Sequence, residues 1–575
     1  MDSMLSLSKV NLRSGSTRIL DEISLEIGQG QLVVILGSNG AGKTSLLRSL
    51  LAQVSIDSGS IHIAGQNLAD LDARQRARWL AWLPQQGSRI EALRVEEVVA
   101  AARFRFDEPR TQSLRVARSA LEKAGAASLQ DRWWPELSGG ERQRVEMATL
   151  IAQESDCWLL DEPANHLDPM WRKRVLSSLE EQVREGTTIV VVLHDVHLLK
   201  SLDGDRIRIV GLREGRLVWD GLFSDPDLEK KLEEIYRDSV PVTETKSEFK
   251  TAGGGAFDMK SPWQWCLAML VAVGAALAST MVGPSLSGEI GQEIFTELRL
   301  PRALAGAVLG AVFAGAGAVV QILLQNPLAT PSTVGTTAGA SLGVIAALVM
   351  ASGSTLLGLP LLPAAAFIGA LTVTLAIASV AARTRSRTED VLLAGIALTL
   401  ATGALSSALR LGFDQVTSLN ALRWSLGSLT LVGYERLQLL APFVTISIIG
   451  MLWLIRSLEV LATGIDRAAT RGVDVPRVRT LGLGFASLGV AAAVATCGPI
   501  AFVGLICPHL IRRVVGSGPR VLVPASMLLG CCFLPLCDAI GRTVLENRDV
   551  PVGVITAALG APVLFLLVLR RSRQS

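Results

Sequence analysis

The segment at residues 37–44 combines glycines, a lysine and a threonine in an order that suits phosphate binding. It follows the apolar run LVVIL and precedes TSLLRSLLAQV, so we predict a loop between a strand and a helix. Backbone N–H groups of such a loop surround phosphates, Lys43 adds a positive charge, and the hydroxyl of Thr44 suits Mg²⁺. The predicted nucleotide-binding residues of the loop are Gly37, Ser38, Asn39, Gly40, Ala41, Gly42, Lys43, Thr44 and Ser45.

Two carboxylates end a second apolar segment, CWLLDE at residues 157–162. Asp161 is predicted to hold Mg²⁺ through water, and Glu162 to polarise the water that attacks the phosphate. An acidic pair after a strand is common by itself, but together with a phosphate-binding loop it indicates ATP hydrolysis. The expected cofactors are therefore ATP and Mg²⁺.

The segment LSGGE at residues 137–141 precedes the helix-forming RQRVEMATLIA. Ser138, Gly139 and Gly140 are therefore predicted to form a second helix N-terminus that can face a phosphate. With the two preceding motifs, this segment resembles the signature motif of ABC transporter ATPases, and the resemblance covers about residues 4–237.

The resemblance to ABC ATPases assigns roles to three further residues. It makes Gln85 in WLPQQ the Q-loop glutamine, which acts in catalysis and binds the metal, and Asp168 in NHLD the D-loop aspartate at the nucleotide. His194 in VVVLHD becomes the switch histidine that contacts the γ-phosphate. Aligning KVNLRSGSTRIL by its flanks puts Leu12 where the family usually stacks an aromatic residue on adenine. Glu141 stands where many members have Gln, a difference that we expect to matter little.

Composition divides the chain into two parts. With 575 residues and a net charge of +3, it is too long for one domain and too balanced to suggest a nucleic-acid partner. The last lysine is Lys260, and the stretch before it contains Gly, Ser, Thr and Lys but little that could pack. We predict an ATPase domain at 1–238, a flexible linker at 239–261 and a membrane domain at 262–575.

The N-terminal segment and the cysteines lead to two further expectations. The first 30 residues contain no apolar core flanked by basic residues, so no secretory signal is expected and the ATPase domain is expected in the cytosol. The seven cysteines show neither zinc spacing nor a secreted disulfide pattern. We interpret Cys531, Cys532 and Cys537 as packing residues of a membrane helix rather than a metal site.

The second part is a series of apolar stretches of about twenty residues, the length that a helix needs to cross about 30 Å of hydrocarbon. The fold class predicted is an α/β P-loop ATPase domain of ABC type, followed by an all-α polytopic membrane domain of about ten transmembrane helices. Arginine-rich loops and the C-terminal tail favour the cytosolic side of a bacterial plasma (inner) membrane. The predicted spans are 264–283, 301–323, 333–352, 356–381, 390–411, 437–456, 478–497, 499–515, 520–537 and 551–570.

Several strings of the second part are more specific than its hydropathy. RLPRALAGAVLGA, QNPLATPSTVGTTAGASLG, GPIAFVGLICPHLIRRVVG and PVGVITAALGAPVLFLL resemble, in this order, the permeases of the iron-siderophore, haem and cobalamin importer family. The resemblance implies a short helix within 463–476 that docks on the ATPase. It also implies arginines that pair with glutamates of a substrate-binding protein, and by motif position these are Arg299, Arg302 and Arg542.

Together the two resemblances imply an ATP-driven importer that works as a homodimer with a separate substrate-binding protein. A ferric siderophore is the first candidate for the transported metal chelate, and cobalamin or haem are the alternatives. An ABC exporter and a regulatory ABC protein without transport are the rival classes. Exporter half-transporters usually have about six spans, and a regulatory protein would not need a permease-like core.

Overall fold

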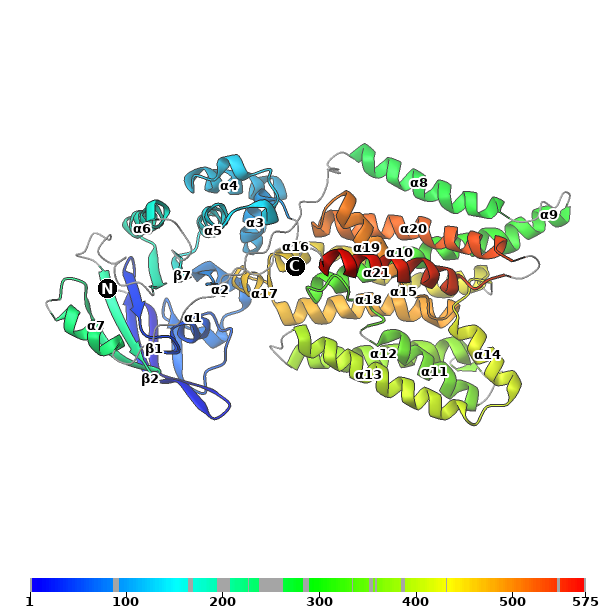
Figure 1. Ribbon diagram of the computed structural model, residues 1–575, viewed down its shortest axis with the longest axis horizontal. Coiled ribbons are helices and arrows are strands. Elements are labelled where there is room, and N and C mark those ends of the chain that lie inside the picture. The colour runs from blue at the N-terminus through cyan, green and yellow to red at the C-terminus, as the bar shows by residue number, and fades with distance from the viewer. Residues whose placement is uncertain are drawn as a thin grey trace. The chain divides into compact units, whose positions relative to one another are not determined.

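The computed structural model describes residues 3–85, 93–163, 169–193, 207–225, 227–236, 262–282, 289–333, 335–350, 355–356, 359–383, 388–430, 432–545 and 549–572. The chain forms two compact units (Figure 1). The first comprises Met1–Gly253 and Thr463–Val475, and the second comprises Gly254–Ala462 and Pro476–Ser575. The predicted linker, 239–261, lies outside the described residues.

A six-stranded sheet forms the centre of the first unit. Its order is β10-β9-β3-β8-β7-β6, and all neighbours are parallel except β10, which runs antiparallel to β9. The strands β3, β7 and β8 are wholly buried and mostly apolar, as is typical of strands covered on both faces. The strands are β3 (Leu32–Leu36), β6 (Leu80–Leu83), β7 (Cys157–Asp161), β8 (Thr188–Val192), β9 (Ile207–Arg213) and β10 (Arg216–Leu222).

The side chains of β3 alternate between two hydrophobic cores. Val33 and Ile35 pack with a second, antiparallel sheet, whereas Val34 and Leu36 pack on the other face of the central sheet. The second sheet has the order β2-β1-β4-β5. Its strands are β1 (Ser3–Ser14), β2 (Thr17–Gly28), β4 (Ser58–Ile63) and β5 (Gln66–Asn67).

Eight α-helices belong to the described part of the first unit, and one of them comes from a distant stretch of sequence. This is the helix α17, which lies within the Thr463–Val475 segment and agrees with the docking helix expected at 463–476. The helices are α1 (Lys43–Leu50), α2 (Ala73–Trp79), α3 (Val95–Ala100), α4 (Arg110–Lys123), α5 (Gly139–Gln153), α6 (Pro169–Arg184), α7 (Leu228–Tyr236) and α17 (Ile465–Thr470).

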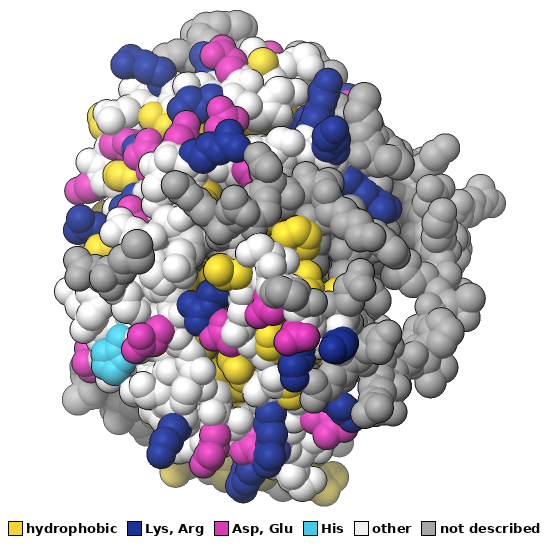
Figure 2. All heavy atoms as spheres, turned by 90° about the vertical axis from the view of Figure 1, so that its left-hand side faces the viewer, with side chains coloured by type: hydrophobic (Ala, Val, Ile, Leu, Met, Phe, Trp, Pro, Cys, Tyr) yellow, Lys and Arg dark blue, Asp and Glu magenta, His cyan; other side chains and the backbone are white. Residues whose placement is uncertain are grey.

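The face shown in Figure 2 carries basic and acidic side chains interspersed in small groups. A nucleic-acid-binding surface instead gathers Lys and Arg on one face. Among the described residues visible there, the mixed charges are therefore typical of an ordinary solvent-exposed surface.

The second unit is a bundle of apolar helices in which α8, α10 and α20 pack alongside one another (Figure 1). Small residues permit this, because a Cβ at Gly310 would collide with the carbonyl of Gly530 on the neighbouring helix. The helices are α8 (Pro262–Met281), α9 (Glu289–Glu293), α10 (Leu300–Leu323), α11 (Thr336–Met350), α12 (Leu361–Arg383), α13 (Thr388–Arg410), α14 (Gln415–Ser425), α15 (Tyr434–Trp453), α16 (Ile455–Ala462), α18 (Val475–Cys497), α19 (Val503–Val514), α20 (Pro519–Thr543) and α21 (Val552–Ser572).

A helix lies at each of the ten predicted spans, although the lengths differ. Within the described residues, 6 helices are long and apolar enough to cross a membrane, and three shorter apolar helices lie at 268–281, 336–350 and 552–563. The prediction at 499–515 is the least accurate, since α19 begins only at Val503 and has 12 residues. Two short strands, β11 (Thr355–Leu356) and β12 (Leu359–Pro360), complete the unit.

Candidate nucleotide site

The loop that joins β3 to α1 has the geometry of an anion cradle. Gly40 and Gly42 adopt φ values of 83° and 97°, which residues with a Cβ rarely tolerate. A Cβ at Gly42 would also lie 2.8 Å from the carbonyl oxygen of Ile19. No described side chain caps the N-terminus of α1. The first N–H groups of this helix, which have no partner within it, can therefore point to a phosphate.

Lys43 lies inside the loop and bonds to its backbone. Its Nζ donates to the carbonyl oxygens of Gly37 at 2.7 Å and Ser38 at 2.9 Å. Burial lowers the pKa of Lys43, while the carboxylates of Glu162 and Asp161 act in the opposite direction. The ammonium group is therefore held beside two carboxylates at the edge of the sheet where parallel α/β folds bind ligands.

Asp161 and Thr44 place side-chain oxygen atoms at the same edge. The hydroxyl of Thr44 donates to Oδ2 of Asp161 at 2.8 Å. In the part of the chain that the structure describes, Oδ1 of Asp161 is buried and has no hydrogen-bond partner. Burial raises the pKa of Asp161, against the hydrogen bond from Thr44. A buried carboxylate oxygen without a donor, beside a hydroxyl, fits a hard cation such as Mg²⁺.

Glu162 and Gln85 meet directly. Nε2 of Gln85, which follows β6, donates to Oε2 of Glu162 at 2.8 Å. Glu162 has a φ of 54°, an uncommon conformation for a residue with a Cβ, and its N–H bonds to the carbonyl of Val192 at 3.0 Å. Such backbone strain persists only where neighbouring contacts impose it, and it is frequent at functional sites.

The signature segment caps its own helix. Ser138 is the N-cap of α5, and its hydroxyl and backbone N–H both bond to Glu141 Oε2 at 2.8 Å. The backbone N–H of Ser138 lowers the pKa of Glu141. Glu141 therefore holds the serine at the helix terminus, and because Gln can complete the same capping box, the expectation that this difference matters little stays a prediction. Gly139 and Gly140 form the first turn of α5 as predicted.

The structure thus brings together Lys43, Thr44, Gln85, Asp161 and Glu162, five of the predicted site residues. Asp168 and His194, the predicted D-loop and switch residues, lie outside the described residues. Their predicted roles remain predictions.

Leu12 does not lie where the sequence alignment put it. Its side chain is 2% exposed and belongs to the core between the two sheets, with Ile35 and Leu46. A side chain enclosed by apolar neighbours cannot present a face to adenine. The prediction that Leu12 occupies the adenine-stacking position is therefore wrong, and the alternation of the strand explains why.

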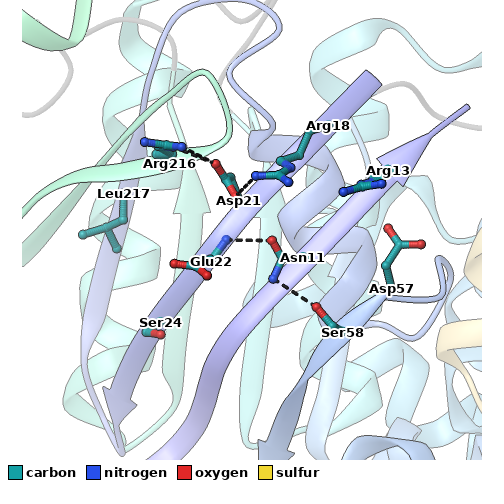
Figure 3. A pocket seen from close by; sticks show the side chains of 10 residues that line it. All are labelled: Asn11, Arg13, Arg18, Asp21, Glu22, Ser24, Asp57, Ser58, Arg216 and Leu217. Atoms are coloured by element: carbon teal, nitrogen blue, oxygen red, sulfur yellow. Dashed lines mark hydrogen bonds and ion pairs between the residues drawn. The ribbon is translucent and has the colours of Figure 1, made fainter. Parts of the chain in front are cut away.

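The opposite face of β1 borders a shallow pocket (Figure 3). There Asp21 accepts hydrogen bonds from Arg216 at 2.7 Å and from Arg18 at 2.6 Å, so the hydrogen bond from Arg216 and the charge of Arg18 lower the pKa of Asp21. Asn11 on the same face bonds to Ser58 at 3.1 Å. These contacts tie the antiparallel sheet to β10, which gives the pocket a structural explanation.

The predicted docking arginines have internal partners in the second unit. Arg302 bonds through Nη2 to Asp538 at 2.8 Å and through Nη1 to Asp549 at 2.9 Å, and its side chain is 16% exposed. Arg542 pairs with Asp538 at 3.4 Å, and its side chain is 12% exposed. Arg302 and Arg542 therefore share the carboxylate of Asp538 in this structure, and their docking role stays a prediction.

Backbone carbonyl oxygens accept hydrogen bonds from Arg542 and from the third predicted arginine, Arg299. Arg542 donates to the carbonyl oxygens of Ser279 at 2.6 Å and Val282 at 2.9 Å, and Arg299 donates to Thr280 at 3.4 Å. The group therefore joins α8, α10 and α20. Asp538 was missed in the sequence, although its spacing of four residues from Arg542 on one helix is a known signal for an ion pair.

Comparison with protein families agrees with this division of the chain. Residues 263–570 match the FecCD transport family, and residues 20–165 match the ABC transporter family. The hemin import ATP-binding protein HmuV of Pseudomonas entomophila (strain L48) is 38% identical over 200 residues, which are 34% of this chain and 78% of that protein. The petrobactin import ATP-binding protein YclP of Bacillus subtilis (strain 168) is 34% identical over 242 residues, 42% of this chain and 95% of that protein.

A solved structure also resembles a part of this chain. It is described as an inward-facing conformation of a proposed metal-chelate type ABC transporter, with 28% sequence identity and a TM-score of 0.50. The match covers 54% of this chain and 100% of that chain.

Proposed function

The chain belongs to the FecCD transport family and carries an ABC-type ATPase as well, and on this basis we propose that ATP hydrolysis drives import of a metal chelate. The observation that carries the proposal is the group of Lys43, Asp161 and Glu162 in a chain that also contains a polytopic permease domain. The names of the relatives, which concern hemin and petrobactin import, support a chelate as the substrate.

The chemistry assigned to the nucleotide site is phosphoryl transfer to water. Lys43 and the N–H groups of α1 bind the phosphates, and Glu162 orients and polarises the attacking water while Gln85 holds its carboxylate. Thr44, Asp161 and Gln85 would hold Mg²⁺, which neutralises charge on the phosphates when it is bound. These electrostatic contacts are stronger in a buried site, because water does not compete for the charged groups there.

We assign the signature residues Ser138, Gly139 and Gly140 to the ATP of a second copy of the chain. One chain supplies one phosphate loop, one signature helix and one permease domain, so a homodimer completes two sites. The uncapped N-terminus of α1 and the glycine-rich start of α5 are both suited to a phosphate. Asp168 and His194 belong to the same proposal through the family resemblance.

The proposed setting is the bacterial plasma membrane, with the ATPase domain in the cytoplasm and a separate protein delivering the substrate. A ferric siderophore is the leading candidate, with haem and cobalamin as alternatives. Arg299, Arg302 and Arg542 are proposed as the docking site of the delivering protein, and Arg302 and Arg542 would exchange Asp538 for carboxylates of that protein. Such docking should weaken with salt, because charge pairs at an interface rim are screened.

ATPase assays in lipid vesicles test this proposal. The full chain should hydrolyse ATP faster when a binding protein loaded with haem or ferric petrobactin is added, and Lys43→Ala should abolish both rates. Arg299→Glu should reduce the stimulation and leave the basal rate unchanged. ATP hydrolysis that responds to no loaded binding protein, cobalamin carriers included, would favour a regulatory ABC protein instead.

A further inference from the structure

The helix α17 contacts the signature helix through a buried ion pair. Arg467 is 2% exposed, and its Nη2 bonds to Oε1 of Glu146 on α5. The same guanidinium lies 5.7 Å from the ring centre of Trp134, four residues before the signature Ser138. A buried guanidinium needs such a carboxylate, because an unpaired charge inside a protein is strongly destabilising.

A second contact connects the signature helix α5 to the segment that carries Glu162. Gln143, three residues before Glu146 and therefore adjacent to it on the helix surface, donates from Nε2 to the carbonyl of Pro163 at 2.6 Å. Pro163 directly follows Glu162, whose backbone is in the uncommon conformation with φ of 54°. Gln143 is thus one of the contacts that impose the position of Glu162.

The other end of α5 makes a parallel connection. Gln153 is 2% exposed and lies two turns after Glu146, and its Nε2 donates to the carbonyl of Thr470 on α17 at 3.0 Å. It also donates to the carbonyl of Leu80 at 2.9 Å, at the start of the strand that leads to Gln85. Two residues of α17 are therefore bonded, through α5, to the segments that carry Gln85 and Glu162.

We propose that Arg467 is a positioning residue for ATP hydrolysis, which acts on Glu162 through Glu146, the rigid helix α5 and Gln143. Hydrogen-bond networks and rigid helices transmit small displacements between sites. Movement of the loop that contains α17 would then change the position of the carboxylate that orients water, within one copy of the chain. The inference rests on the proposed role of Glu162.

The test measures kcat and KM for ATP with the full chain in lipid vesicles, together with thermal unfolding and equilibrium ATP binding. Arg467→Met, Glu146→Gln and Gln143→Ala should each lower kcat about tenfold, since small misplacements of reacting groups are costly, and leave KM nearly unchanged. Gln143→Ala leaves the ion pair intact, so it remains informative if Arg467→Met destabilises the protein.

Two comparisons separate positioning from a merely structural role. Glu108→Gln is the matched control, because the Glu108 side chain is also buried and paired with an arginine, Arg103, at 2.9 Å, and it bonds to Ser113 of α4. It should lower the unfolding temperature as Glu146→Gln does, with kcat unchanged. In the double variant Arg467→Met/Gln143→Ala, kcat should fall no further than in the worse single variant, because the two residues act in series.

Unchanged kcat in Gln143→Ala and Arg467→Met, or effects that multiply in the double variant, would overturn the inference. A kcat loss in Glu108→Gln equal to that in Glu146→Gln would do the same. Failure of the proposed function gives a different result. If no metal chelate is transported, the kcat losses of the single and double variants should still follow the pattern expected here. If Glu162→Gln hydrolyses ATP normally, the role assigned to Glu162 itself is wrong.

Discussion

The nucleotide site of the first unit and the arginine group of the second unit are both clusters of opposite charges, but their sequences predicted them with different success. Lys43, Asp161 and Glu162 lie together as their spacing predicted. Arg302 and Arg542 were expected to pair with glutamates of a binding protein, and in this structure they pair with the buried Asp538, which the sequence did not single out.

The two groups differ in what determines the positions of their residues, which is local sequence in the first group and packing between distant helices in the second. Asp161 ends β7, Glu162 follows it, and Lys43 begins the helix that a short loop joins to β3, so the backbone places the three residues at a common edge of one sheet. Arg302 and Asp538 are 236 residues apart, and only the packing of α10 against α20 brings them together. Strand and loop motifs thus predict where a backbone lies, whereas the exposure of a charged side chain depends on distant partners.

Glu162→Gln should have the largest effect, on the well-predicted side of the comparison. Removing the carboxylate that activates water should lower kcat about 10²–10⁴-fold, the usual contribution of a general base. Equilibrium binding of ATP should persist, because Lys43 and Asp161 remain. Lys43→Ala is the counterpart that should lose binding itself, and loss of binding in Glu162→Gln would contradict the assigned role.

Asp538→Asn tests the other side of the comparison. It leaves two buried arginines without their shared carboxylate, so the free energy of unfolding should fall by about 3–5 kcal/mol, as for other broken buried pairs. Thermal unfolding of the full chain in lipid nanodiscs measures this. Asp549→Asn is the control, because the Asp549 side chain is 45% exposed and its loss should cost less. Equal stability of the two variants would show that Asp538 does not hold the arginines.

Leu12→Tyr separates the corrected position from the expected one. Because Leu12 is enclosed in the core, a larger phenol should overpack it and lower the free energy of unfolding by about 1–3 kcal/mol. ATP affinity should not increase. Tighter ATP binding with unchanged stability would restore the original assignment of Leu12 to the adenine face.

The smallest effect concerns pH. Burial raises the pKa of Asp161, so protons should compete with Mg²⁺ at a higher pH than for an ordinary aspartate. Below that pKa the affinity for Mg²⁺ should fall about tenfold per pH unit. Titration of Mg²⁺ in the presence of ATP, with metal-free ATP binding as the reference, measures the shift. An affinity that stays constant down to the pKa of a free aspartate would contradict the buried site.

The parts that could be predicted are those encoded in contiguous motifs or in long apolar runs. The P-loop, the strand before Asp161 and the helix after LSGGE follow from local patterns, as do most membrane helices. The side chain of Leu12 was misplaced because its position was taken from flanking sequence, although strand alternation puts it with Val10 in the core.

Ion pairs between residues that are far apart in the chain could not be predicted from the sequence. The docking helix was expected from the family resemblance, but its buried pair with Glu146 joins residues 321 positions apart. Nothing in the string around Glu146 distinguishes it from a solvated helix position. Asp538 differs, since its spacing to Arg542 was visible and would have supported an internal pair.

Directional transport tests the central claim, that ATP hydrolysis moves a metal chelate toward the side of the ATPase domain. The full chain is placed in vesicles with this domain outward, and radiolabelled haem, ferric petrobactin or cobalamin is enclosed in the lumen with its binding protein. Added Mg²⁺ and ATP should release one of these labels from the lumen, and Glu162→Gln should release none. Accumulation of external label in the lumen, or ATP hydrolysis without movement of any of the three compounds, would contradict the account.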